Sequence, residues 1–506
     1  MWSRFLAVSL LLAPLTGAQA TAERVSQRAP GPPGQSLTVK TSSGTFTGFI
    51  HPSLPDTNQW LGIPYARPPI GARRFMPPEK APKNGTHDAK AYKPICLQDT
   101  GDKVGVFWEL VPEYQNRDAE SEDCLYLNIW GPRARNPGPK KLPVIIWVVG
   151  GGFKEGGGHA DYYVPDRWIQ RTQTHLVVTF NYRLNIFGFP GSPAANKNVG
   201  LMDMRLVIEW LKDNIDGFGG DPKRMVLWGH SAGSNAVLMY GYANPQKPIV
   251  SGLIAGSSGT PTITANSSAV FHNLAQVIGC ANLTSAAELA CVQAIDPFVL
   301  RDAVDAFNTN PFRGLFRPIA DGVTVFGNLT DRLEKGQIAK IPLIAGYTYN
   351  EPAAFLAFDP NATSPPAPTV PGTEGLACGI KREALARVKY GLTTYRYLFS
   401  GNFTNTTPRY WLGGMHCSEL PLVFGTHHLF RGNSTEFEWQ TSFAMESFWV
   451  AFASNPDVNP KNHLGQVWPK FSAANGDIVV FGNATGPSQS YSANAEAADK
   501  FYAGFC

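Results

Sequence analysis

The chain contains several continuous apolar runs, each of which ends at a glycine or at polar residues. Residues 142–149, LPVIIWVV, form one such run, which is rich in β-branched side chains and is followed directly by Gly150. Residues 175–182, HLVVTFNY, have the same character. Short runs of this kind are typical of strands that are buried on both faces of a parallel sheet. We therefore expect central strands in both segments.

A helical pattern separates the second run from a third. Its apolar residues are spaced by 3, 4, 3 and 4 positions, which places them on one helical face: Leu201, Met204, Ile208, Leu211 and Ile215. Gly217 then ends the pattern, and residues 224–228, RMVLW, begin the next apolar run. A strand, a helix and a strand in this order predict a crossover unit of a parallel sheet.

The third run leads into the sequence GHSAG, in which Ser231 stands between Gly229 and Gly233. The small and apolar residues that follow can begin another helix. Ser231 is therefore expected at a strand-to-helix turn, where open α/β sheets bind ligands. Side chains at the two glycines would collide with the neighbouring strand and helix. A chance match is the alternative, because the chain has 50 glycines, but the strand-turn-helix setting favours a nucleophilic serine.

A nucleophilic serine requires a histidine that takes its proton, an acid that orients the histidine, and backbone N–H groups that stabilise the oxyanion. The three glycines at residues 150–152 suit the last role, because a substrate can approach their main chain closely. A flexible loop is the alternative, and residues 156–158, also GGG, show that the chain has such loops. The position of the first cluster at a strand end favours oxyanion binding.

The chain also resembles a known family. The matching motifs are WLGIPYARPPIGARRFMPP from Trp60, SEDCLYLNIW from Ser121, VVGGGF from Val148, NYRLNIFGF from Asn181, NVGLMDMR from Asn198 with DNIDGFGGDP after it, the GHSAG turn, AGYTYNE from Ala345, and GGMHCSELPLVFG from Gly413. From about residue 37 to the C-terminus, this set is similar to the type B carboxylesterases, the α/β-hydrolase family that includes cholinesterases and fungal lipases. The resemblance implies a secreted fungal enzyme with a single catalytic domain over residues 21–506. It implies an α/β-hydrolase fold, with a large, mostly parallel central sheet flanked by helices.

The resemblance also assigns the active-site residues. It implies that Ser231 is the nucleophile, Glu351 in GYTYNE the acid and His416 in GGMHCSELP the base, in the chain order typical of α/β-hydrolases. Taken alone, Glu351 would more often be a solvated loop carboxylate, and His416 is one of ten histidines. The flanking motifs favour the catalytic roles. The oxyanion donors would be the N–H groups of Gly151, Gly152 and Ala232.

Scaffold contacts follow from the same resemblance, namely a disulfide between Cys96 and Cys124, an ion pair of Arg74 with Glu122, an ion pair of Arg183 with Asp203, and a hydrogen bond near the triad from Ser258. Two positions depart from the family pattern. Val149 precedes the glycine cluster where relatives usually carry histidine or tyrosine, and Pro352 follows Glu351 where glycine is usual. Because proline restricts the residue before it, we expect an extended backbone at Glu351.

The first twenty residues have the features of a secretory signal peptide. Arg4 precedes an apolar stretch from Phe5 to about Leu15, and Ala18-Gln19-Ala20 forms a small-x-small ending. No later segment reaches the ~18 uninterrupted apolar residues of a membrane-spanning helix, so we expect a secreted protein without a stable membrane anchor. The net charge of +4 is too weak to suggest nucleic acid as a partner. Glycosylation sequons fit export, and they begin at Asn84, Asn266, Asn282, Asn328, Asn361, Asn402, Asn405, Asn433 and Asn483.

Seven cysteines in an exported chain predict disulfides. Two pairs would close loops, a short one between Cys280 and Cys291 and a longer one between Cys96 and Cys124. The other three are Cys378, Cys417 and Cys506, so at least one thiol is free or is paired between chains. Cys417 either ties down the loop that carries His416 or is an untethered thiol.

These parts predict a serine carboxylic ester hydrolase that needs no metal or organic cofactor. His416, polarised by Glu351, removes the Ser231 proton during attack on the ester carbonyl, and water later hydrolyses the acyl-enzyme. Because the base must be neutral, activity should fall below a pH of about 6 to 7. A non-catalytic binding protein on the same fold is the alternative from another class, but all three triad positions are filled.

The predicted substrate rests on the GHSAG turn and on one loop. His230 stands where cholinesterases carry a glutamate, which disfavours choline esters, and it is expected to point away from the Ser231 oxygen. The loop at residues 97–123 is a lid in related fungal lipases. Here it contains apolar residues that can line or cover a gorge, but also many charges. Small to medium or aromatic esters are therefore the predicted small-molecule substrates, and long-chain acylglycerols are the alternative. The apolar residues of this loop are Val104, Val106, Phe107, Trp108, Leu110 and Val111.

Overall fold

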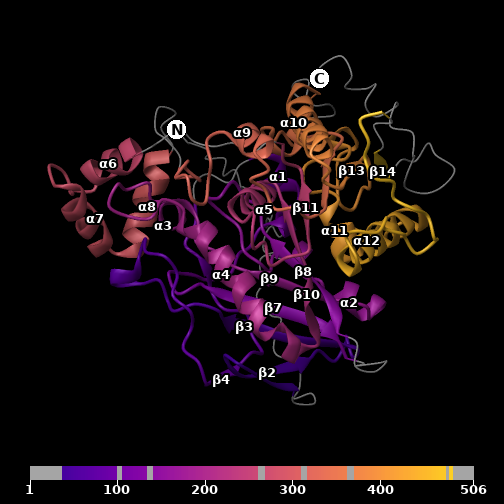
Figure 1. Cartoon of the computed structure of the whole chain (residues 1–506), viewed down its shortest axis with the longest axis horizontal. Coiled ribbons are helices and arrows are strands. Elements are labelled where there is room, and N and C mark those ends of the chain that lie inside the picture. Colours follow the sequence, from indigo (N-terminus) through magenta and orange to yellow (C-terminus); the bar gives the residue numbers. More distant parts are fainter. Residues whose placement is uncertain are drawn as a thin grey trace, which may run out of the picture.

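A twelve-stranded mixed sheet lies at the centre of the molecule (Figure 1). Its strands are β1 (Leu37–Thr41), β2 (Gly44–Ile50), β3 (Thr57–Pro64), β4 (Gly85–Asp88), β7 (Tyr126–Pro132), β8 (Leu142–Val148), β9 (Leu176–Phe180), β10 (Gly220–His230), β11 (Gly252–Gly256), β12 (Leu343–Thr348), β13 (Thr394–Phe399) and β14 (Val479–Phe481). Their order is β1-β2-β3-β7-β9-β8-β10-β11-β12-β13-β14, with β4 beside β2. Neighbours from β9 to β14 are parallel, whereas the pairs from β1 to β9 are antiparallel. The sheet is therefore mostly parallel, as the sequence predicts.

The structure is a computed structural model that describes residues 37–99, 105–133, 141–259, 268–308, 316–361, 370–474 and 478–482. Its α-helices are α1 (Val106–Leu110), α2 (Asp166–Thr172), α3 (Asn185–Gly188), α4 (Val199–Asn214), α5 (Ala232–Ala243), α6 (Ser268–Val277), α7 (Ser285–Ala294), α8 (Pro297–Asn308), α9 (Leu329–Glu334), α10 (Val370–Lys389), α11 (Leu420–Phe424) and α12 (Glu436–Ser454). A 3-10 helix, η5, spans Glu351–Phe355, and the short strands β5 (Ile95–Cys96) and β6 (Glu120–Ser121) form a second small sheet.

The predicted crossover unit is confirmed. Helix α4 lies between β9 and β10 in the chain, preceded by the short helix α3. In the sheet, β8 lies between β9 and β10 and is parallel to both. The five apolar residues of the helical pattern are all buried, and the last of them, Ile215, comes directly after α4. Their regular spacing therefore marks the face by which α4 packs on the core.

Helices cover both faces of the central strands. Every residue from Met225 to His230 in β10 is buried, and because side chains of a strand alternate between faces, both faces must be covered. Helix α5 packs on β10 and β11, and α12 packs on β8 and β10. Trp147 of β8 and Trp228 of β10 have ring centroids 4.4 Å apart, and Trp228 stacks on Phe424 of α11 at 4.9 Å. This packing fixes β8 and β10, the two strands that end at the candidate site.

The scaffold contacts implied by the family resemblance are present. Cys96 and Cys124 form a disulfide. In each of the two implied ion pairs, the arginine guanidinium makes two hydrogen bonds to the partner carboxylate. Arg74 donates to Glu122 at 2.6 and 2.7 Å. Arg183 donates to Asp203 at 2.8 and 2.7 Å. The disulfide and the Arg74 pair fix both ends of the loop that begins at residue 97.

A second disulfide joins Cys280 to Cys291, as predicted. It connects the end of α6 to α7, and these helices form a group with α8 at one side of the sheet (Figure 1, left). Cys378 is also disulfide-bonded. Cys417 is a buried free thiol, which settles the alternative left open by the sequence. Cys506 lies outside the described residues.

Residues 1–20, the predicted signal peptide, also lie outside the described residues. Among the helices that the structure describes, none is both long enough and apolar enough to cross a bilayer. Asn405 is buried, and its side-chain nitrogen donates at 2.9 Å to His427 O and to Ser434 Oγ, which does not fit glycosylation at this sequon. Asn266 and Asn483 lie outside the described residues. The exposed sequon asparagines are Asn84, Asn282, Asn328, Asn361, Asn402 and Asn433.

Candidate active site

Ser231 occupies the turn between β10 and α5, as the sequence predicts. Its φ is +57°, a value that residues other than glycine rarely adopt. Its N–H donates to the carbonyl oxygen of Gly256 at 2.9 Å, and its own carbonyl accepts from the N–H of Asn235 at 3.1 Å. Strand β11 and the first turn of α5 therefore hold the strained turn from two sides, while Ser231 remains partly exposed.

The two glycines around this turn are required for steric reasons, which confirms the prediction. A Cβ at Gly229 would lie 2.3 Å from the carbonyl oxygen of Gly233. A Cβ at Gly233 would lie 2.1 Å from the carbonyl oxygen of Val148. Both obstacles are backbone atoms, so neither can move aside. A side chain at Gly229 would push α5 away from the turn, and one at Gly233 would push α5 away from β8.

The glycine loop after β8 packs directly against the Ser231 turn. A Cβ at Gly150 would lie 2.7 Å from the carbonyl oxygen of His230. Gly151 and Gly152 have φ values of +98° and +65°, which favour glycine. Ala232 is the first residue of α5, so its N–H has no acceptor within the helix. The N–H groups predicted as oxyanion donors thus come from two segments in close contact.

Glu351 and His416 are brought together from positions 65 residues apart. His416 Nδ1 lies 2.5 Å from Glu351 Oε2, and both side chains are buried. The other carboxylate oxygen, Oε1, accepts from the N–H of Thr348 at 2.8 Å. Burial raises the pKa of the Glu351 carboxyl, but the facing His416 and the nearby His230 lower it more, so its pKa lies below the ordinary value. Glu351 is therefore an ionised hydrogen-bond acceptor for His416.

The expectation of an extended backbone at Glu351 is wrong. Glu351 is instead the first residue of η5, with Pro352 in the first turn. Proline is tolerated there because the first N–H groups of a helix have no acceptor within it. The N–H of Glu351 donates to Thr373 Oγ1 at 3.0 Å, which anchors the start of η5. Pro352 therefore does not prevent the carboxylate from reaching His416.

A cavity of about 420 Å³ is lined by Ser231, His416 and Gly150–Gly152. This volume is in the range of small-molecule sites. Six aromatic side chains also line the cavity, namely Phe107, Trp108, Tyr114, Trp147, Tyr163 and Phe355. Polar and charged side chains form another part of the wall, among them Gln98, Gln115 and Glu155. The prediction that the loop from residue 97 lines the gorge is confirmed for Phe107 and Trp108. Val106 and Val111 are buried in the core instead, and Val104 lies outside the described residues.

Phe355 and Arg317 give the cavity wall two distinct features. The Phe355 side chain is 68% exposed, and its ring centroid lies 4.9 Å from that of His416. It is therefore an apolar surface beside the candidate base. Arg317 also lines the cavity, and its buried Nε has no hydrogen-bond partner among the described residues. Burial lowers the pKa of Arg317 from its usual value, but the group remains a cation at neutral pH.

His230 does not pair with the acid of the candidate triad. Its Nε2 lies 3.2 Å from Glu419 Oε1, and its Nδ1 lies 3.5 Å from the Cys417 sulfur. Burial opposes the charged form of His230, but Cys417 and Glu419 favour it more, and the pKa of His230 is raised to about 9. Burial raises the pKa of the Cys417 thiol, against the effect of His230. Two carboxylate-imidazole pairs thus lie side by side, with His230 and His416 ring centroids 4.6 Å apart.

Ser258 is linked to the candidate triad indirectly, through Asn235. Its Oγ donates to Asn235 Oδ1 and to the carbonyl oxygen of Gly259. Since the N–H of Asn235 donates to the Ser231 carbonyl, Ser258 supports the first turn of α5. The sequence analysis missed Glu419, Arg317 and the cavity-facing role of Trp147. Glu419 lies within the matched GGMHCSELP motif, and this position could have identified it as a candidate site residue. No sequence pattern marks Arg317.

The arrangement brings together a serine on a strained turn, a carboxylate-bonded imidazole and a glycine loop in one aromatic cavity. A family model described as "Carboxylesterase family" matches residues 35–369 and 372–498. The chain is 40% identical to the chlorogenic acid esterase of Aspergillus niger, over 88% of this chain and 91% of the relative. It is 37% identical to secreted lipase 5 of Gibberella zeae, over 83% and 86%. Identity to the acetylcholinesterase of Bungarus fasciatus is 29%, over 89% and 83%.

Proposed function

Since the chain belongs to the carboxylesterase family and is a carboxylic ester hydrolase, we propose that it cleaves esters through an acyl-enzyme on Ser231. In this mechanism His416 accepts the Ser231 proton as the oxygen attacks the ester carbonyl. Glu351 orients the imidazole and stabilises its protonated form. The alcohol leaves with that proton, and water then attacks the acyl-enzyme with the same base.

The N–H groups of Gly151, Gly152 and Ala232 hold the oxyanion that forms at each attack. Such donors act best when they are fixed before the reaction, because no reorganisation is then needed in the transition state. The packing of the glycine loop against the His230 carbonyl supports this role. Loss of one donor typically costs about 3 kcal/mol of transition-state stabilisation.

One observation carries the proposal: the bond of 2.5 Å between His416 Nδ1 and Glu351 Oε2. It holds His416 in the wall of the cavity that Ser231 also lines. With Nδ1 bonded to the carboxylate, Nε2 is the imidazole nitrogen left to accept a proton. The positive φ of Ser231 supports the nucleophile, since strained backbone of this kind occurs at the nucleophile turns of hydrolases.

Small to medium or aromatic esters are the proposed substrates. The aromatic side chains of the wall can stack on an aromatic acyl or alcohol group, and about 420 Å³ accommodates a molecule of that size. The similarity to a chlorogenic acid esterase supports an aromatic ester. Arg317 adds a cation whose Nε has no protein partner among the described residues, and this favours a substrate with an oxygen acceptor or a carboxylate.

Long-chain acylglycerols are the second candidate. The similarity to a secreted lipase and the 68% exposure of Phe355 at the cavity wall favour this alternative. A lipase gains activity when its substrate forms an oil interface. Initial rates on dissolved short esters, dissolved aromatic esters and emulsified long-chain triglyceride distinguish the candidates, with Ser231→Ala as the blank. The highest kcat/KM is expected on dissolved aromatic esters, and a sharp gain at the oil interface would favour the lipase instead.

We also propose that the enzyme is secreted. The apolar segment within residues 1–20, the disulfides and the exposed sequons at Asn84, Asn282 and Asn433 support export. Expression of the full chain in a fungal host, followed by N-terminal sequencing of protein from the medium, tests this. The mature protein is expected to begin at Thr21. Retention of the protein in the cells with residues 1–20 still attached would contradict the proposal.

A further inference from the structure

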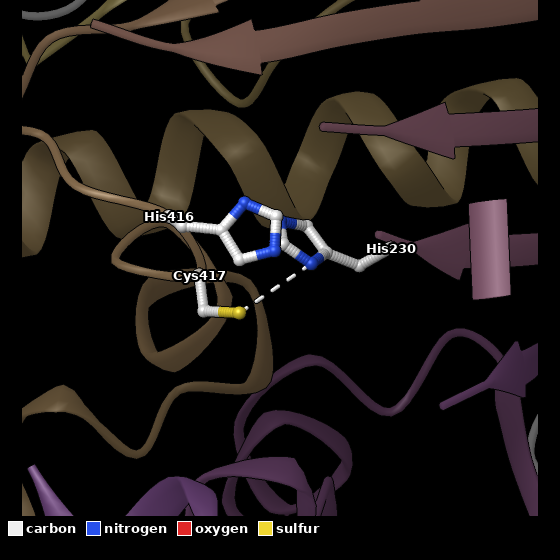
Figure 2. A group of neighbouring side chains, drawn as sticks. All are labelled: His230, His416 and Cys417. Carbon is white, nitrogen blue, oxygen red and sulfur yellow. Dashed lines mark hydrogen bonds between the residues drawn. The ribbon is translucent and has the colours of Figure 1, made fainter. Parts of the chain in front are cut away.

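Three side chains that commonly bind metals meet in the wall of the cavity: His230, His416 and Cys417. All three are buried, and one ligand atom of each lies within 4.8 Å of the other two. Figure 2 shows the Cys417 sulfur turned toward His230 and the two imidazole rings beside each other. The distance of 3.5 Å between His230 Nδ1 and Cys417 Sγ is that of two neighbouring ligands on tetrahedral zinc, about 3.5 Å.

A second observation points to a metal at the same place. Histidines that bind metals usually have a carboxylate or carbonyl on their other ring nitrogen, which fixes the ring and strengthens the ligand. Both imidazoles have a carboxylate beside that nitrogen, hydrogen-bonded for His416 and at ion-pair distance for His230. Glu351 lies 2.5 Å from His416 Nδ1, and Glu419 lies 3.2 Å from His230 Nε2. His416 Nε2 and His230 Nδ1 are then the nitrogens left for a metal ion.

We propose that His230, His416 and Cys417 form a reversible, inhibitory binding site for a thiophilic divalent cation of the zinc class. Sulfur with two imidazoles suits Zn²⁺, Cd²⁺ or Cu²⁺, whereas Mg²⁺ and Ca²⁺ prefer oxygen ligands. Zinc replaces the proton of the Cys417 thiol and the Nδ1 proton of His230, and both protons pass to solvent. The thiolate and the carboxylates of Glu351 and Glu419 compensate the two charges of the ion.

The backbone around Cys417 fits a fixed ligand. Cys417 has a φ of +72°, which is rare for a residue with a side chain. Its carbonyl oxygen accepts from the Tyr114 hydroxyl at 3.0 Å, which helps to hold this conformation. All three ligands line the cavity, so an ion can enter from solvent and a water molecule can complete its coordination. Because the ligand atoms lie up to 4.8 Å apart, small side-chain shifts are needed to bring all three onto one ion.

Inhibition rests on the proposed role of His416, because a metal on Nε2 removes the lone pair that accepts the Ser231 proton. Metal binding itself rests only on the geometry. The ion is therefore an inhibitor and not a cofactor, and the ester hydrolysis described above proceeds without it.

Equilibrium dialysis against Zn²⁺ after chelator treatment tests the site on the full-length protein. We expect one tight zinc in the wild type and in Ser231→Ala. Cys417→Ala is expected to weaken binding by at least about 100-fold, and Glu419→Gln by about 10- to 100-fold, as for other residues that orient metal-binding histidines. His272→Gln is the control, because His272 is a partly exposed histidine bonded to Glu288 and does not line the cavity. Unchanged zinc affinity in Cys417→Ala would overturn the proposal.

Cobalt provides a readout that does not depend on any variant. Co²⁺ added to the wild type is expected to give a sulfur-to-cobalt charge-transfer band in the near ultraviolet, and its absence would overturn the site. The activity assay then tests inhibition, which EDTA should reverse in the wild type. Each variant is compared with its own metal-free rate, and Cys417→Ala should need at least about tenfold more zinc for half inhibition. Tight zinc binding in a protein without esterase activity would leave the metal site standing and refute the proposed function.

Discussion

His416 Nδ1 lies 2.5 Å from Glu351 Oε2, although the two residues are 65 positions apart in the chain. Two elements fix this distance. Glu351 begins η5 shortly after β12, and the N–H of Thr348 donates to its Oε1. His416 lies in a loop, and the carbonyl oxygen of the next residue, Cys417, accepts a hydrogen bond from the Tyr114 hydroxyl. The bond therefore depends on the fold as a whole and gives the first prediction.

Glu351→Gln is expected to lower kcat by about 10³- to 10⁴-fold, because an amide no longer stabilises the imidazolium and favours the wrong tautomer. KM should change little, since Glu351 does not line the cavity. Glu383→Gln is the matched control, because Glu383 is also buried, bonds Tyr242 and lies outside the cavity wall. Steady-state kinetics on one dissolved ester measure both. Equal losses in the two variants would contradict the role of Glu351.

Gly151→Ala tests the oxyanion loop. Gly151 has a φ of +98°, and its added Cβ would lie 2.1 Å from the carbonyl oxygen of Glu155, so the loop must move. We expect a loss of kcat of about 100-fold or more, comparable with the loss of one oxyanion donor. Gly219→Ala is the control, because Gly219 has a similar φ of +94° but no atom within 4 Å of the added Cβ.

That control separates backbone strain from catalysis. Gly219→Ala should cost about 1 to 2 kcal/mol of stability and leave kcat unchanged, because it adds only the strain of a positive φ. Urea unfolding and kinetics on the same preparations provide both quantities. If the two variants lose the same stability and the same activity, the loop at Gly151 has no special part in the reaction.

Arg317→Gln is expected to change the preference between charged and neutral esters, and to leave the hydrolysis of neutral esters nearly unchanged. Its cation lines the cavity with an unpaired Nε, and a hydrogen bond to a charged group contributes about 1.5 to 3 kcal/mol. For a pair of aromatic esters that differ only in a carboxylate on the alcohol part, KM of the carboxylate ester should rise about tenfold or more. KM of the neutral ester should stay within about twofold. A parallel rise for both esters would argue against carboxylate recognition by Arg317.

His175 predicts a loss of stability in acid. It is fully buried before β9, and burial lowers its pKa to about 3. The unfolded chain binds a proton on this residue below a pH of about 6.5, whereas the folded chain does not. The stabilising contribution is therefore present above about pH 6.5 and is lost as pH falls toward 3, at up to about 1.4 kcal/mol per pH unit.

His175→Gln removes this titration. Its free energy of unfolding should decline less than that of the wild type between pH 6.5 and 4, when both are measured by urea unfolding. His272→Gln is a suitable control, because His272 is partly exposed and pairs with Glu288. Parallel pH profiles for the wild type and His175→Gln would rule out a neutral buried His175.

The sequence was most informative where a local pattern determines the structure. Runs of apolar residues predicted β8, β9 and β10, because these strands are buried on both faces. The glycines at positions 229 and 233 predicted the sharp turn, because backbone atoms lie within 2.3 Å of any added Cβ. The motifs also marked Glu351 and His416, and the structure brings these side chains together.

Contacts between distant segments could not be predicted where no matched motif assigned them. Cys417 and His230 are separated by 187 positions, and no sequence pattern predicts that they lie close together. Trp147 reads as a core residue within an apolar strand, yet it also forms part of the cavity wall. The backbone at Glu351 was predicted wrongly, because the rule for residues before proline does not consider the helix that begins there.

The proposed role of Ser231 as the nucleophile is tested by labelling with an organophosphate ester. Diethyl 4-nitrophenyl phosphate transfers its phosphoryl group to an activated serine and releases nitrophenol. We expect one added diethylphosphoryl group per chain, located by peptide mass spectrometry at Ser231, together with full loss of esterase activity and no labelling of Ser231→Ala. Labelling of Ser231→Ala to the same extent, or complete inactivation of the wild type with the label on another residue, would contradict it.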